Sequence, residues 1–291
     1  MTAAHLPQNF LGLPEADATY ERARVVVLPV PYDSTASYGA GARFGPAAIL
    51  EASRQVELYD DELGRTPAEV GVHTLAPLLP VMSGPQGMID AVAEVADRCC
   101  ADGKLPLMLG GEHSLSVGTV RACARAHGRL SILQIDAHAD LRDSYEGTPF
   151  SHACAARRLL DFGEVTGVGI RALSAEEQEF ATRTGRRIFW ARDIARDRDD
   201  RWIDQVVAGL EDPVYVTFDL DGLDPAVIPA TGTPEPGGLG WYQALALLRR
   251  VGESRRVVGC DVVELAPAPG SHVSDFAAAR LAYKMIGYFA R

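Results

Sequence analysis

Apolar runs alternate with helical patterns along the whole chain, and this alternation restricts the possible folds more than any other feature. Several runs, such as Val25–Leu28, are apolar at every position rather than at every second one. That pattern is typical of parallel strands that are buried on both faces. Strands that alternate with helices therefore predict an α/β fold, with one three-layer α/β/α domain around a mostly parallel central sheet.

The expected elements follow from these patterns. The predicted strands span Arg24–Val30, Leu105–Leu109, Leu130–Ile135, Val165–Ile170, Arg187–Trp190, Val214–Phe218 and Val257–Val263. The predicted helices span Pro46–Ser53, Pro85–Ala101, Ser114–Ala126, Ser151–Leu160, Ala175–Arg183, Arg201–Leu210, Trp241–Val251 and Asp275–Phe289. Because no linker or repeat interrupts them, we expect residues 1–291 to form a single domain, with residues 1–22 as an N-terminal extension.

Acidic and histidine side chains follow three of the predicted strands, at the point where each strand ends. These residues are His113, Asp136, His138, Asp140, Asp219 and Asp221. The carboxyl ends of parallel strands meet at one edge of a sheet, where open α/β folds place their sites, so we expect the six side chains to lie together. Carboxylates that cluster away from water stay ionised only when a cation lies among them.

The six donors are a candidate ligand set for two divalent metals. Oxygen and nitrogen donors without a thiolate suit two Mn²⁺ ions, although Ni²⁺ or another divalent ion also fits. A carboxylate that bridges two ions holds them roughly 3.5–4 Å apart, and a bridging water is acidified to hydroxide. This predicts hydrolysis at an sp² carbon. The alternative, that these aspartates only cap helices or occupy turns, requires the same coincidence at three strand ends.

The overall charge restricts the partners of the protein. A formal net charge of -11 disfavours nucleic acid and anionic membrane surfaces, and suits a small cationic substrate. No apolar stretch approaches the ~18 residues that span a bilayer, and no signal peptide is visible at the start of the sequence. The five cysteines are an odd number without C-x-x-C spacing, which indicates reduced thiols and a cytoplasmic protein.

Five motifs follow one another along the chain in a specific order. They are Gly110–Ser114, Asp136–Asp140, Asp219–Pro225, Pro229–Leu239 and Asp261–Glu264. In this order they resemble the signature motifs of the ureohydrolase (arginase/agmatinase) family. The similarity covers nearly the whole chain, since it begins at Val30–Asp33 and Gly41–Pro46. The resemblance implies an arginase-like fold and a binuclear-metal amidinohydrolase that releases urea from a guanidino compound through a metal-bridging hydroxide.

The resemblance also implies a role for each site residue. One metal is expected on His113, Asp136, Asp140 and Asp219, and the other on Asp136, His138, Asp219 and Asp221, so that Asp136 and Asp219 bridge. His152 matches the proton-shuttling histidine at the mouth of the site, a role that suits an imidazole near pH 7. Glu264 matches the carboxylate that pairs with the substrate guanidinium, which a carboxylate binds in a two-pronged way.

The loop Leu141–Ser151 is expected to select the substrate. It contains no Asn, and its Tyr145–Gly147 segment resembles the agmatinase branch, which implies that agmatine is converted to putrescine and urea. Asp143 and Glu146 are then the candidate partners of the substrate ammonium, with Thr233 as a further contact. Arg142 instead favours a carboxylate tail, so guanidinobutyrate, arginine, another guanidino acid and free guanidine remain alternatives.

Two other classes of protein remain open at this point. One is an amide hydrolase on the related deacetylase fold, against which the complete ligand set argues. The other is a non-catalytic metal-binding paralogue that works through protein contacts. The resemblance further implies Mn²⁺ in most cases, Ni²⁺ in some, and a homo-oligomer that is a trimer or a hexamer.

Overall fold

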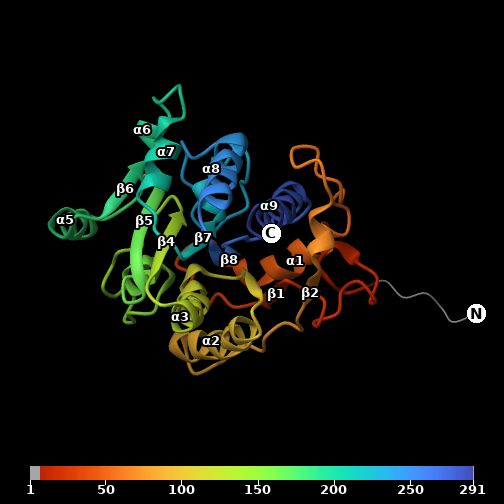
Figure 1. Cartoon of the computed structure of the whole chain (residues 1–291). Helices are drawn as coiled ribbons and strands as arrows, with labels where there is room; N and C mark the ends of the chain where they lie inside the picture. Colours follow the sequence, from red (N-terminus) through yellow and green to blue (C-terminus); the bar gives the residue numbers. More distant parts are fainter. Residues whose placement is uncertain (1–6, 291) are drawn as a thin grey trace, which may run out of the picture.

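A parallel sheet of eight strands forms the centre of the molecule, which we describe from a computed structural model covering residues 7–290. The strands lie in the order β2-β1-β3-β8-β7-β4-β5-β6, and every pair of neighbours is parallel (Figure 1). Helices cover both faces of the sheet. The predicted three-layer α/β domain is therefore confirmed.

The strands agree closely with the apolar runs of the sequence. They span β1 Val25–Val30, β2 Val72–Thr74, β3 Leu105–Gly110, β4 Leu130–Ile135, β5 Gly163–Ile170, β6 Arg187–Trp190, β7 Val214–Asp219 and β8 Val257–Val263. Only the edge strand β2 lacks a counterpart among the predicted runs, because three residues carry no readable pattern. Strands β4, β7 and β8 are buried along their entire length, as expected for strands covered on both faces.

Two groups of helices form the outer layers (Figure 1). One hydrophobic core packs against α1 Gly45–Ser53, α7 Arg201–Ala208, α8 Trp241–Ser254 and α9 Val273–Phe289. A second core packs against α2 Pro85–Ala101, α3 Ser116–His127, α4 Ala155–Leu159 and α5 Ala175–Thr184. The four-residue helix α6, Ala191–Ile194, was too short to predict. Among the described residues, no helix is long and apolar enough to cross a membrane.

One predicted helix, Ser151–Leu160, is shorter than expected. Its first turn, His152–Cys154, is a 3-10 helix, and α4 begins only at Ala155. Ser151 keeps an extended backbone, with φ -71° and ψ 156°. This irregular entry matters for the site, because it places His152 at the start of the turn rather than within an α-helix.

The strand order decides which loops meet at the carboxyl edge of the sheet. Strands β3, β8, β7 and β4 are consecutive neighbours in the middle of the sheet, although they are far apart in the sequence. The last residue of β7, Asp219, and the segments that follow these four strands carry all six predicted ligands and Glu264. The sheet thus gathers them above its centre, where open α/β folds place their sites.

Candidate metal centre and active site

Five of the six predicted ligands converge into two groups that share Asp136, and the sixth, Asp219, lies beside His113 of the first group. In the first group, the Nδ1 atom of His113 lies 3.1 Å from Asp136 Oδ2, 3.2 Å from Asp140 Oδ2 and 3.3 Å from Asp219 Oδ2. In the second group, the Nδ1 atom of His138 lies 2.9 Å from Asp221 Oδ2 and 3.7 Å from Asp136 Oδ1. All of these side chains except that of His138 are buried.

Hydrogen bonds behind His113 indicate that its Nδ1 atom carries a lone pair. The Nε2 atom lies 2.9 Å from the Thr217 hydroxyl, which itself donates to Asp261 Oδ1 at 2.7 Å. Asp261 accepts from Tyr215 and from the Thr217 hydroxyl, so we assign the ring proton to Nε2. The Nδ1 atom is buried without a hydrogen bond and faces carboxylate oxygens, which are acceptors too. Acceptors gathered in this way require a cation, and the site therefore fits a metal ion.

The electrostatics of the carboxylates support the same reading. Burial, together with Asp140 and Asp221, raises the pKa of Asp136 to about 7. Burial and the charges of Asp221 and Asp136 raise the pKa of Asp219 well above its usual range. Both shifts express the cost of keeping several buried carboxylates ionised together. Two divalent cations would remove that cost.

We expect removal of the metals to destabilise the fold, by about 10 °C in melting temperature. The metal-free protein should lose further stability as the pH rises from about 4 to about 7. The reason is that the pKa of Asp136 rises from 3.8 to about 7 in the folded state, which then holds more protons than the unfolded chain. Calorimetry with and without chelator measures both effects. Equal melting temperatures with and without metal would contradict the metal assignment.

Backbone and side-chain amides hold the carboxylates in place. Asp136 accepts from Gln134 Nε2 at 2.8 Å and from the backbone N–H of His138 at 2.6 Å. Asp221 accepts from the N–H of Ala137 at 3.0 Å. These bonds fix the orientation of the ligand oxygens before any metal binds, which limits reorganisation on binding.

His152 lies at the mouth of the site and is held by Thr35. The Thr35 hydroxyl accepts from the backbone N–H of His152 at 3.0 Å and lies 3.2 Å from its Nδ1 atom. The same hydroxyl donates to Glu112 Oε1 at 2.8 Å. Burial lowers the pKa of His152 below its usual value, so the imidazole is neutral near pH 7 and is able to accept a proton. Thr35 was not predicted, because its loop carries no local signal beyond the nearby Pro31–Asp33 motif.

Glu264 adopts a strained backbone conformation at the end of β8. Its φ is 67°, a left-handed value that is uncommon for a residue other than glycine. Its Oε1 atom accepts from the N–H of His113 at 2.6 Å. Burial and the neighbouring Glu112 carboxylate raise the pKa of Glu264 to about 8. A guanidinium ion beside it would restore the charged form.

Two adjoining cavities open above the ligands. The inner one, about 20 Å³, is lined by every predicted ligand except Asp136, together with His152, Thr233 and Glu264. The outer one, about 270 Å³, shares Ser37, His138, Asp140, His152 and Thr233 with the inner one and adds Arg142, Tyr145, Glu177 and Glu235. The shared residues make the two cavities a continuous path from the metal site to the surface.

Of the three predicted tail-binding residues, only Thr233 lines the cavities. The Thr233 hydroxyl lies 3.5 Å from Asp221 Oδ2 and faces both cavities. Asp143 is exposed and forms an ion pair with Arg158 at 2.7 Å, while Glu146 is exposed; neither is among the residues that line the cavities. The contact of Asp143 and Glu146 with a substrate tail therefore stays a prediction without geometric support.

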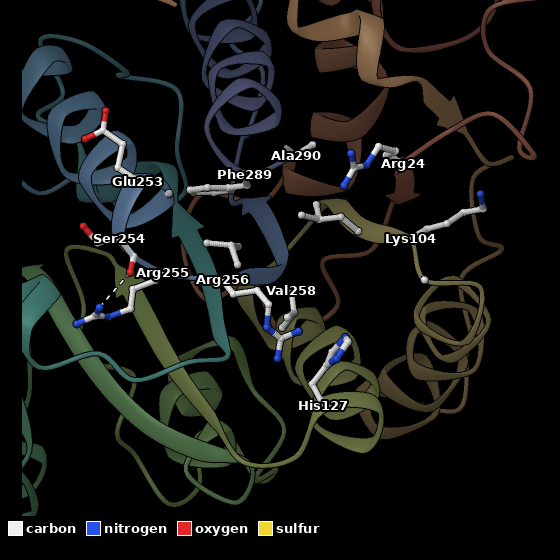
Figure 2. Close-up of a pocket in the computed structure, with 14 residues that line it drawn as sticks. Arg24, Lys104, His127, Glu253, Ser254, Arg255, Arg256, Val258, Phe289 and Ala290 are labelled. Atoms are coloured by element: carbon white, nitrogen blue, oxygen red, sulfur yellow. Dashed lines mark hydrogen bonds between the residues drawn. The ribbon is translucent and has the colours of Figure 1, made fainter.

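A larger cavity of about 560 Å³ lies at the opposite, amino edge of the sheet (Figure 2). Arg24, Lys104 and Arg256 line it, and each stands at the start of a strand or just before one. Cations at this edge compensate the negative ends of the helix dipoles, which all lie there in a parallel α/β fold. The Arg255 guanidinium turns away and donates to backbone carbonyls, including that of Leu210. We assign this cavity no part in the chemistry.

Comparisons with known proteins agree with this geometry. A model of the "Arginase family" matches residues 23–287. The N(1)-aminopropylagmatine ureohydrolase of Synechocystis sp. is 44% identical over 98% of this chain and 97% of its own. The agmatinase of Pyrococcus horikoshii is 36% identical over 97% and 96% of the two chains. The proclavaminate amidino hydrolase structure from Streptomyces clavuligerus is 30% identical, with a TM-score of 0.90 over 99% and 98% of the chains.

Proposed function

Because the chain belongs to the arginase family and is a ureohydrolase acting on a guanidino compound, we propose that its substrate is a linear guanidino-polyamine. The leading candidate is N(1)-aminopropylagmatine, whose hydrolysis yields spermidine and urea. Agmatine, which yields putrescine and urea, is the second candidate. The convergence of six donors, five of them buried, around His113 and His138 carries the hydrolase assignment.

The first candidate rests on the relatives. Four relatives named N(1)-aminopropylagmatine ureohydrolase are 38% to 44% identical to this chain, each over at least 93% of it. Relatives named agmatinase are 34% to 38% identical. The two substrates share the guanidinium and the four-carbon spacer, and differ only beyond the first amine. The residues near the metals therefore bind the same part of either substrate.

The residues of the chain divide the chemistry among themselves. The two metals would lie on the groups around His113 and His138, and would supply Lewis-acid activation of the attacking water. Glu264 orients the guanidinium in the inner cavity through charge-assisted hydrogen bonds. His152 carries a proton to the leaving amine, and Thr35 keeps its ring facing the site. The narrow inner cavity excludes bulk water from the groups that react.

We also propose that the metals are Mn²⁺ and that the protein is a homo-oligomer, a trimer or a hexamer. Oxygen and nitrogen donors without a thiolate support a borderline-hard ion, while availability in the cell decides the occupant. Elemental analysis of the protein as purified from cells identifies the metal. Light scattering gives the oligomeric state.

Urea release tests the proposed function. The Mn²⁺-loaded protein is assayed with N(1)-aminopropylagmatine, agmatine, 4-guanidinobutyrate, arginine and free guanidine. We expect the highest kcat/KM for N(1)-aminopropylagmatine and a lower value for agmatine. A preference for agmatine would select the second candidate. A preference for 4-guanidinobutyrate or arginine would refute the polyamine assignment, and absence of urea from all five would refute the proposed function.

A further inference from the structure

We propose that Glu235 forms the subsite that recognises the first amine beyond the four-carbon spacer of the substrate. This inference rests on the proposed function and adds the residue that selects amine tails over carboxylate tails. Glu235 is half-buried and lines the outer cavity. It is not a predicted metal ligand, and it lies outside the Leu141–Ser151 loop.

The carboxylate of Glu235 is free to receive a cation. Within residues 7–290 it takes part in no ion pair. Of the other acidic residues on the outer wall, Asp140 belongs to a ligand group. Glu177 is engaged too, since its two oxygens accept from the backbone N–H groups of Leu141 at 2.9 Å and Ser174 at 2.7 Å. Among the described residues, Glu235 has no such direct contact on its carboxylate, and the nearest charge that acts on it is the Arg171 guanidinium, which binds its backbone.

The loop around Glu235 is held rigidly. Arg171 donates to the backbone carbonyl of Glu235 at 2.7 Å and to that of Pro236 at 3.2 Å. Asp224 accepts from the N–H groups of Gly237 at 2.8 Å and Gly238 at 3.1 Å. These contacts bind main-chain atoms only, so they fix the position of Glu235 and leave its carboxylate for a ligand. A carboxylate that is held in place loses little entropy when it binds an amine.

The length of the four-carbon spacer is compatible with this position of Glu235. Thr233 contacts Asp221 at 3.5 Å, and Glu235 follows two residues later, at most about 7 Å along the chain. In an extended four-carbon spacer, six bonds of about 1.5 Å separate the guanidinium carbon from the amine, a span of roughly 7 Å. An amine on this spacer therefore reaches the part of the outer cavity that Glu235 lines.

Arg142 does not oppose a cationic tail at this position. Its Nε atom lies 3.8 Å from Glu177 Oε2, and its guanidinium stacks over the Tyr145 ring at 4.9 Å. Both contacts compensate its charge within the wall of the cavity. Arg142 is therefore already paired within the wall and does not favour a substrate with a carboxylate tail.

The test compares tails with and without an amine. In Glu235→Gln we expect kcat/KM for agmatine and for N(1)-aminopropylagmatine to fall about 10- to 100-fold, mainly through KM, because a charge-assisted contact is lost. For butylguanidine, which has the same spacer and no amine, we expect a change of less than about threefold. Glu211→Gln, at an exposed carboxylate on the amino side of β7, is the matched control and should behave as wild type with all three substrates.

Charge reversal gives a second, independent readout. Glu235→Lys should lose activity with agmatine and gain relative preference for 4-guanidinobutyrate, whose carboxylate it pairs with. Equal losses with agmatine and butylguanidine in both variants would overturn the subsite, as would unchanged KM for the amine substrates. If wild type itself releases no urea from any of these compounds, the proposed function fails. If wild type turns over these compounds and Glu235→Gln leaves kcat/KM for the amine substrates unchanged, the subsite alone is overturned.

Discussion

Replacing Asp136 by Asn is expected to lower kcat/KM at least about 1,000-fold and to reduce the metal content of the protein. Asp136 is the residue that the two ligand groups share, so its loss affects both metal positions. Asn keeps the size of the side chain but has one neutral oxygen, which does not bridge two cations. The loss should therefore exceed that of a change at a residue that serves one position only.

Urea release and elemental analysis of the same preparation measure this effect. Asp161→Asn is the matched control, since Asp161 is an exposed aspartate and should retain full activity and metal. The Asp136→Asn protein should also fold without metal more readily than wild type, because a buried charge is removed. Full metal content and near-normal activity in Asp136→Asn would refute the shared-ligand assignment.

Replacing His152 by Ala is expected to lower kcat about 100- to 10,000-fold while KM changes little. His152 faces both cavities but belongs to neither ligand group, so metal content should remain that of wild type. The proton that the leaving amine requires must then come from water. Urea release over a range of substrate concentrations separates kcat from KM, and elemental analysis verifies the metals.

Two further variants sharpen the result for His152. His127→Ala changes a histidine at the end of α3, on the amino side of the sheet, and should behave as wild type. Thr35→Val removes the hydroxyl that contacts His152 and Glu112. It should lower kcat, but by less than His152→Ala does. A His152→Ala protein with wild-type kcat, or one that has lost its metals, would contradict a role in proton transfer.

Polyamine chemistry fits the charge of the whole molecule. A protein with a net charge of -11 attracts a cationic substrate, and the same attraction slows the release of a cationic product. We therefore expect association with guanidino-polyamines to slow as the salt concentration rises. Local groups still decide specificity, because long-range fields are screened over roughly 10 Å at moderate salt.

Local patterns were enough to predict most elements of the fold and the positions of the six donors along the chain. Strand β4 is buried at every residue, so Asp136 directly after it had to lie at the sheet edge. The same reasoning applies to Asp221 after β7. The short elements β2 and α6 were missed because three or four residues show no periodicity.

The sequence by itself determined the ligand types and the edge of the sheet at which they lie. A carboxylate that directly follows a buried parallel strand lies at the carboxyl edge of the sheet. Only the tertiary structure decided which loops surround them. The order β3-β8-β7-β4 sets Glu264 against His113, although 151 residues separate the two. Thr35 beside His152 and Glu235 on the outer wall likewise depend on contacts between distant loops, which no local pattern encodes.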